Sequence, residues 1–152
     1  SKQQKYRTLL NVAVPAGMWQ KAEEIICDDK DREYLRKIRK DYKNLVRNIW
    51  NPFDKSHEGI LGCTTVNRLY ITPIGDVLVC PYVHIKIGNI FKQSLKEIVD
   101  FGFSIKHFRN HSDLCLAGED KSFIRKFMTK QGQSIFKPAE AKEIFQKEDF
   151  VL

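Results

Sequence analysis

The spacing of three cysteines restricts what this chain can fold into more than any other feature of its sequence. Cys63 is followed by eleven residues, Gly75, four residues and Cys80, and Cys115 comes after a further 34 residues. Residues 67–83 predict an antiparallel hairpin, which folds the chain back and places its two ends side by side. We therefore expect Cys63 and Cys80 to meet at the open end of the hairpin. A short capped helix beyond it is expected to return Cys115 to the same end.

The hairpin is predicted from two β-rich runs and the turn between them. The runs 67–72 and 77–83 flank the sequence Pro73-Ile74-Gly75-Asp76. Proline suits the first central position of a type I turn, and Gly75 is expected to take the left-handed conformation of a three-residue loop.

Three converging thiolates repel each other unless they are protonated or bound to a metal. A soft cation resolves that repulsion, either as an iron–sulfur cluster or as zinc. The residues alone leave two other interpretations open, namely three small buried side chains or a disulfide. Cys27 follows Ile25 and Ile26 on a stretch expected to be helical, and we expect it to pack rather than to bind metal.

These cysteines lie in a segment that resembles a known family of domains. Residues 62–98 resemble the first part of a SPASM or twitch domain, and the likeness continues more weakly to residue 130. It rests on the Cys-x11-Gly-x4-Cys spacing, on the sequence Tyr-Ile-Thr-Pro-Ile-Gly-Asp-Val-Leu-Val-Cys-Pro and on Ile-Gly-Asn-Ile before Ser-Leu-Lys-Glu-Ile. SPASM and twitch domains follow the partial TIM barrel of radical SAM enzymes and hold auxiliary [4Fe–4S] clusters.

The resemblance implies a metal site and also limits it. It implies that Cys63, Cys80 and Cys115 bind one auxiliary [4Fe–4S] cluster, as in a twitch domain, because the further cysteines of a full SPASM domain are missing. A cluster of this kind takes four ligands. An open iron or His57 is expected at the fourth position. The remaining candidates are Cys27 and Asp113.

The chain lacks the Cys-x3-Cys-x2-Cys motif that binds the cluster at which radical SAM enzymes cleave S-adenosylmethionine. The resemblance therefore implies that S-adenosylmethionine and its cluster belong to a parent enzyme. This chain alone is not expected to be catalytic. Its expected partner is a radical SAM core upstream in the parent chain, for which the auxiliary cluster transfers electrons or binds a peptide, protein or small-molecule substrate.

We expect an α+β fold, with an antiparallel hairpin, helices around it and a strand–helix piece of a partial barrel before it. Residues 1–52 are expected to be the barrel piece, and residues 53–152 the auxiliary iron–sulfur domain. In the first part, Leu9–Val14 predicts a buried strand, and an apolar stripe predicts a helix within Trp19–Trp50. That stripe consists of Leu35, Ile38, Tyr42, Leu45 and Ile49. Further helices are predicted from Ser94, from Asp120 to Lys130 and from Pro138.

Composition limits the other functions. The net charge of +7 favours a zinc-binding module that recognises nucleic acid as the alternative, but a zinc ribbon or finger has a Cys-x2-Cys pair that is missing here. The basic residues are interleaved with acidic ones, which is typical of a solvated surface, so we expect no nucleic-acid partner. No apolar run is long enough to span a membrane. Few cysteines and no secretory signal predict a reducing, cytoplasmic location. The histidines His84, His107 and His111 are expected to be structural.

Overall fold

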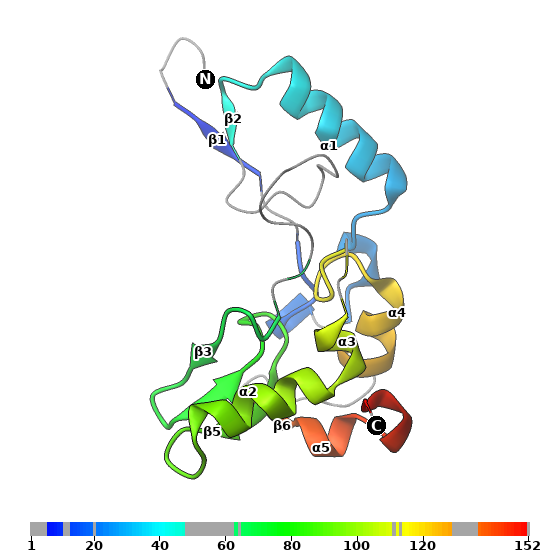
Figure 1. The fold of residues 1–152 in the computed structure, drawn as a ribbon. Helices are drawn as coiled ribbons and strands as arrows, with labels where there is room; N and C mark the ends of the chain where they lie inside the picture. The colour runs from blue at the N-terminus through cyan, green and yellow to red at the C-terminus, as the bar shows by residue number, and fades with distance from the viewer. Residues whose placement is uncertain are drawn as a thin grey trace.

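The structure is a computed structural model, and it describes residues 6–10, 13–19, 21–47, 63, 65–110, 112, 114–128 and 137–151. Along the chain, the strands and helices are β1 (Thr8–Leu9), α1 (Asp29–Asp41), β2 (Val46–Arg47), β3 (Tyr70–Ile71), β4 (Asp76–Leu78), β5 (Ile85–Asn89), α2 (Leu95–Ser104), α3 (Lys106–Arg109), α4 (Lys121–Phe123), β6 (Ala139–Glu140) and α5 (Ala141–Ile144). Figure 1 shows β1, α1 and β2 at one end of the molecule and the remaining elements at the other. No helix in the described ranges could cross a lipid bilayer, because each is too short or too polar.

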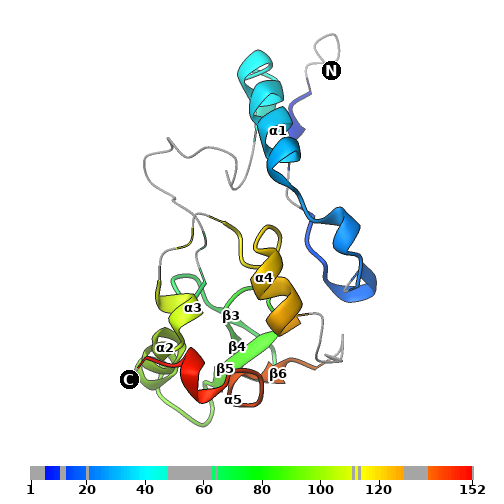
Figure 2. The same cartoon turned by 90° about the vertical axis from the view of Figure 1, so that its right-hand side faces the viewer.

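The predicted α+β class is confirmed, and the sheet is larger than the predicted hairpin. Four strands lie in the order β3-β4-β5-β6; β3, β4 and β5 are antiparallel neighbours, and β6 pairs with β5 in parallel. Helices α2 and α5 both pack against β5, and Figure 2 shows them beside the sheet. The core between these layers includes Val77, Ile85, Ile98, Ile105, Ile124 and Phe127, all of which are buried.

The hairpin of β3 and β4 has the predicted turn. Gly75 N donates to Thr72 O over 2.9 Å, and Thr72 N donates to Asp76 O over 2.9 Å. Gly75 has a φ of 82°, the left-handed conformation that its position requires. The predicted strands 67–72 and 77–83 were too long, because main-chain turns at both ends of the hairpin stop the regular pairing after β3 and β4.

Strand β5 and helix α2 approach each other closely at Gly88. A methyl group there would lie 2.7 Å from Cγ1 of Ile98, which is fully buried. We expect Gly88→Ala to lower the free energy of unfolding by about 1–3 kcal/mol, the usual cost of overpacking. Urea unfolding checks this. Gly17→Ala is the matched control, because Gly17 has open space around it and only its positive φ of 59° is strained by alanine. A loss at Gly88 below about 0.5 kcal/mol, typical of a neutral surface site, would contradict the close approach.

The predictions for the N-terminal part were right in type and wrong in extent. Strand β1 contains only Thr8–Leu9 and is exposed, whereas a buried strand over 9–14 was predicted; residues 11 and 12 lie outside the described ranges. It pairs in parallel with β2, and α1 connects the two. Helix α1 is shorter than the predicted helix because Asp28 and Asp31 form a capping box at its start. Beyond the end of α1, residues 46–47 extend to pair with β1.

The later helices follow their caps. Ser94 and Glu97 form the predicted capping box at the start of α2. Asp120 caps α4, which continues as the π-helical turn Ile124–Met128, so a helical segment is confirmed there. The helix predicted to begin at Pro138 begins instead at Ala141 as α5, because residues 139–140 pair with β5 as β6.

A polar cluster attaches the C-terminal segment to the helices. Asp149 is buried, and it accepts hydrogen bonds from Gln146 N (2.9 Å) and from Lys126 Nζ (3.0 Å). His107 Nε2 lies 3.3 Å from Oδ1 of the same carboxylate. Burial raises the pKa of Asp149, but these hydrogen bonds outweigh it and hold that pKa below its ordinary value.

The lowered pKa of Asp149 predicts a pH dependence of stability. The contribution of this carboxylate is complete above its unfolded-state pKa of about 3.9 and is lost as pH falls through the lower folded-state pKa. We expect Asp149→Asn to be less stable than the wild type by about 1–3 kcal/mol at pH 6, and the difference to shrink towards pH 3. Urea unfolding at a series of pH values measures both curves. Parallel curves down to pH 3 would contradict the prediction.

Candidate metal centre

Main-chain hydrogen bonds hold the three predicted cysteine segments together. Cys63 N donates to Ser112 O over 2.8 Å, three residues before Cys115. Val66 N donates to Val79 O over 3.3 Å, which ties the turn after Cys63 to the residue just before the second cysteine. All three cysteines are half-buried, and each packs against the hydrophobic core. The predicted convergence of these segments therefore follows from bonds between their backbones.

The turn after Cys63 has a strained residue that packs against α2. Val66 has a φ of 65°, a left-handed conformation that is costly for a β-branched side chain. Its side chain is buried, and a methyl group added at Gly102 of α2 would lie 3.0 Å from Val66 Cγ2. Gly102 thus leaves room for the Val66 side chain, although the backbone conformation of Val66 is unfavourable by itself.

The thiols act on one another electrostatically. Burial raises the pKa of Cys115 to about 12, and the charges of Cys63 and Cys80 add to that shift. Burial also raises the pKa of Cys80, with a smaller contribution from Cys63. Without a metal, the two thiols are therefore protonated at neutral pH. A metal that is bound by the thiolates must therefore displace those protons.

Backbone amides favour the thiolate form of two of the cysteines. Tyr82 N donates to Cys80 Sγ over 3.5 Å, and the next amide also lowers the pKa of this thiol. The amides of Ala117 and Gly118, two and three residues along the chain from Cys115, lower the pKa of its thiol. Amide donors of this kind stabilise the thiolate form, and in iron–sulfur proteins they tune the reduction potential.

The described side chains form no site that could hold a single metal ion by itself. Among the described residues, no three His, Cys, Asp or Glu side chains are close enough together to hold one metal ion. A [4Fe–4S] cluster places each cysteine on a different iron and so accepts thiols that are further apart. The four cysteines are free, so the disulfide that the sequence left open is not formed.

A buried carboxylate that the sequence interpretation missed supports the turn at residues 115–119, called the Cys115 turn below. Glu119 Oε2 accepts a hydrogen bond from Cys115 N over 2.8 Å, and Glu119 N donates back to Cys115 O over 2.8 Å. Burial raises the pKa of Glu119, against the hydrogen bond from Cys115 and the charge of Arg32, which lower it. The signal in the sequence was a glutamate four residues after a cysteine that was already suspected of binding metal.

The remaining candidates are placed as follows. Cys27 lies in the irregular segment just before α1, not on a helix. The charges that act on its thiol come from Asp31, Glu119, Arg32 and Asp28 and not from a cysteine. His57 and Asp113, the candidate fourth ligands, lie outside the described residues, as does His111. His107 forms a hydrogen bond with the buried carboxylate of Asp149, in the polar cluster of the fold described above.

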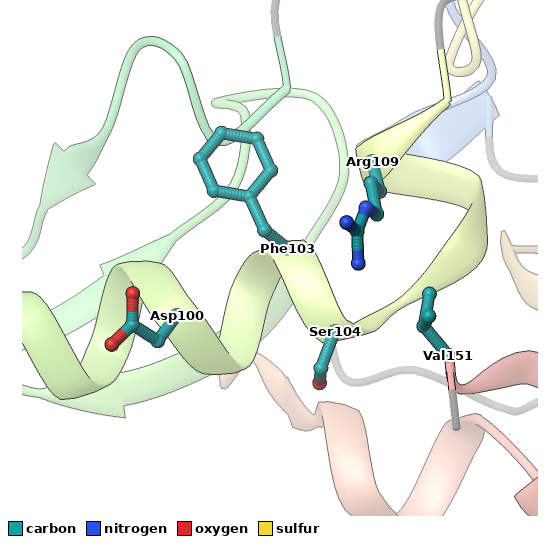
Figure 3. A pocket seen from close by; sticks show the side chains of 5 residues that line it. All are labelled: Asp100, Phe103, Ser104, Arg109 and Val151. Atoms are coloured by element: carbon teal, nitrogen blue, oxygen red, sulfur yellow. The ribbon is translucent and has the colours of Figure 1, made fainter.

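A groove elsewhere on the surface is lined by none of Cys63, Cys80 and Cys115. It has a volume of about 550 Å³ and is lined by Asp100, Phe103, Ser104, Arg109 and Val151. Figure 3 shows Arg109 pointing into the space between α2 and the C-terminal segment. Because no cysteine lines it, this groove is separate from the candidate metal centre.

Comparisons with known proteins agree with the chemistry of the cysteines. Residues 63–118 match the model of the SPASM family, described as an iron–sulfur cluster-binding domain. The match begins at Cys63, includes Cys80 and Cys115, and ends three residues after Cys115. Comparisons with curated proteins and with solved structures gave no significant match.

Proposed function

We propose that Cys63, Cys80 and Cys115 hold one auxiliary [4Fe–4S] cluster. The premise is that residues 63–118 form a SPASM-type iron–sulfur cluster-binding domain. The observation that carries the proposal is the set of main-chain bonds that ties the three cysteine segments together. The Tyr82 amide that donates to Cys80 Sγ is the kind of donor that such a site needs, and the amides of Ala117 and Gly118 lower the pKa of Cys115.

The cluster, when bound, supplies either a centre for electron transfer or an open iron at which a substrate binds. The residues of the chain determine its properties through three effects. Thiolates from Cys63, Cys80 and Cys115 bind it, the backbone amide of Tyr82 donates to the sulfur of Cys80, and the surrounding core limits the access of water. The fourth position is an open iron or His57.

We also propose that the domain serves a radical SAM core in a longer parent enzyme, in the cytoplasm. In this proposal residues 1–52 belong to the partial barrel and residues 53–152 form the auxiliary domain. The parallel pairing of β1 with β2 through α1 supports it, since a strand–helix–strand connection is the repeating unit of such barrels. Free cysteines fit a reducing compartment.

Metal analysis after anaerobic reconstitution tests the proposal. We expect iron and acid-labile sulfide in equal amounts, and a broad absorption near ~400 nm that bleaches on reduction, as for thiolate-bound clusters. Bound zinc with no sulfide would support the zinc-binding module instead. A protein that takes up neither metal would leave three packing cysteines and would refute both functions.

A further inference from the structure

Helix α1 reaches the Cys115 turn through an ion pair that is almost completely buried. Arg32 Nη1 of α1 lies 3.8 Å from Glu119 Oε1, and the two side chains are 13% and 0% exposed. The same Nη1 donates to Cys27 O over 3.1 Å, and Nη2 pairs with the exposed carboxylate of Asp29, so the guanidinium is held at the start of α1.

The two oxygens of Glu119 have different partners. Oε2 accepts the hydrogen bond from Cys115 N. Oε1 is buried and has no hydrogen-bond partner among the described residues, so its interaction is the charge contact with Arg32. One carboxylate thus joins a residue of the N-terminal helix to the backbone of a proposed cluster ligand.

The buried pair of Arg32 and Glu119 is expected to add little to the stability of the fold. A buried ion pair often contributes little net stability, and a buried oxygen without a hydrogen bond is unfavourable. Other contacts join the N-terminal segment to the rest of the chain without burying a charge. They are the exposed ion pair of Glu23 with Arg125 (2.7 Å) and the buried side chain of Ile26. The pair of Arg32 and Glu119 differs from them because it alone among these contacts touches the Cys115 backbone.

We propose that the ion pair of Arg32 and Glu119, which we call the Arg32–Glu119 relay, couples the docking of α1 to the conformation of the Cys115 turn. When α1 is docked, the relay holds Cys115 in position for the cluster. The inference rests on the proposed function, because it assigns a role towards the cluster that Cys115 is proposed to bind. Arg32 and Glu119 are positioning residues in this scheme. Neither is a cluster ligand.

Thermodynamic linkage makes the relay testable from both ends. If docking of α1 tightens cluster binding by some factor, cluster binding must favour docking of α1 by the same factor. Typical couplings between sites correspond to about 5–150-fold changes in affinity. The cluster should therefore be lost faster when the relay is broken, and α1 should be less dynamic when the cluster is present.

The first experiment measures cluster loss to a chelator from the full, anaerobically reconstituted chain, followed near ~400 nm. We expect Arg32→Ala and Glu119→Gln each to lose the cluster about tenfold faster than the wild type, a change within the usual range of coupling. Glu23→Gln is the matched control, because it weakens the exposed ion pair with Arg125 and does not touch the Cys115 turn. Its rate should stay within about twofold of the wild type. Equal rates for all four proteins would overturn the relay.

The second experiment measures the dynamics of α1 instead of the loss of the cluster. Hydrogen–deuterium exchange of the wild type with and without cluster should show slower exchange in residues 29–41 when the cluster is bound, and Arg32→Ala should remove that difference. Unchanged exchange in α1 of a wild type that holds its cluster would overturn the relay and leave the proposed function intact. A wild type that takes up no cluster would refute the proposed function and the relay with it.

Discussion

Replacing Cys115 by alanine is expected to abolish the cluster or to reduce bound iron to a small fraction of the wild-type amount. Cys63, Cys80 and Cys115 supply three thiolates, and two thiolates cannot hold a [4Fe–4S] cluster that takes four ligands. Cys63→Ala and Cys80→Ala should have the same effect. Iron content and absorption near ~400 nm, measured after anaerobic reconstitution, check all three variants.

Cys27→Ala is the matched control for these variants. Cys27 is a half-buried free cysteine like the others, but the charges that act on its thiol come from Asp and Glu carboxylates and from Arg32. We expect the variant to keep the iron content and absorption of the wild type. Loss of the cluster in Cys27→Ala together with its retention in Cys115→Ala would show that the ligand assignment is wrong.

The second large effect is expected at Phe127, in the aromatic cluster of the core. Its ring centre lies 4.8 Å from those of His107 and Phe145 and 5.0 Å from that of Phe123. The side chain is only 2% exposed, so its removal leaves a cavity. We expect Phe127→Ala to lower the free energy of unfolding by about 3–5 kcal/mol, as is usual for a buried phenylalanine.

Urea unfolding of the apo protein measures this effect without interference from the cluster. Phe127→Leu is the comparison, because leucine fills most of the same space, and its loss should be clearly smaller. The slope of the unfolding line should not change between the variants. A loss below about 1 kcal/mol for Phe127→Ala would contradict the packing described for this cluster.

Local rules predicted the elements that a few neighbouring residues determine. The turn at Gly75 and the capping box of Ser94 and Glu97 depend on contacts within five residues, and both form as expected. The same holds for the helical segment that follows Asp120. Such features are readable from sequence because the residue types that favour them leave few other conformations.

Features that depend on distant residues were predicted poorly. Strand β6 exists because residues 139–140 pair with β5, more than fifty positions earlier, and a proline three residues before α5 could not indicate this. Helix α1 was predicted too long because the apolar stripe in the sequence continues to Ile49, whereas Val46–Arg47 extend to pair with β1. In both cases tertiary pairing overrides the local periodicity.

The cysteine segments were predicted to converge, and their backbones are tied together. The hydrogen bonds that join them were not predictable, because Ser112 O and Val79 O carry no side-chain signal. Glu119 was missed for a different reason, since a single glutamate near a cysteine has many possible roles until its burial is known. The choice of His57 or an open iron remains a prediction.

Mössbauer spectroscopy of the wild-type chain, reconstituted anaerobically with iron-57 and sulfide, tests the central claim most directly. It reports the state of every bound iron atom and therefore distinguishes a cluster from a single thiolate-bound ion. The account predicts that the bound iron gives the spectrum of a [4Fe–4S] cluster held by cysteine thiolates. A spectrum of isolated iron ions, or the absence of bound iron under conditions in which the chain is folded, would contradict it.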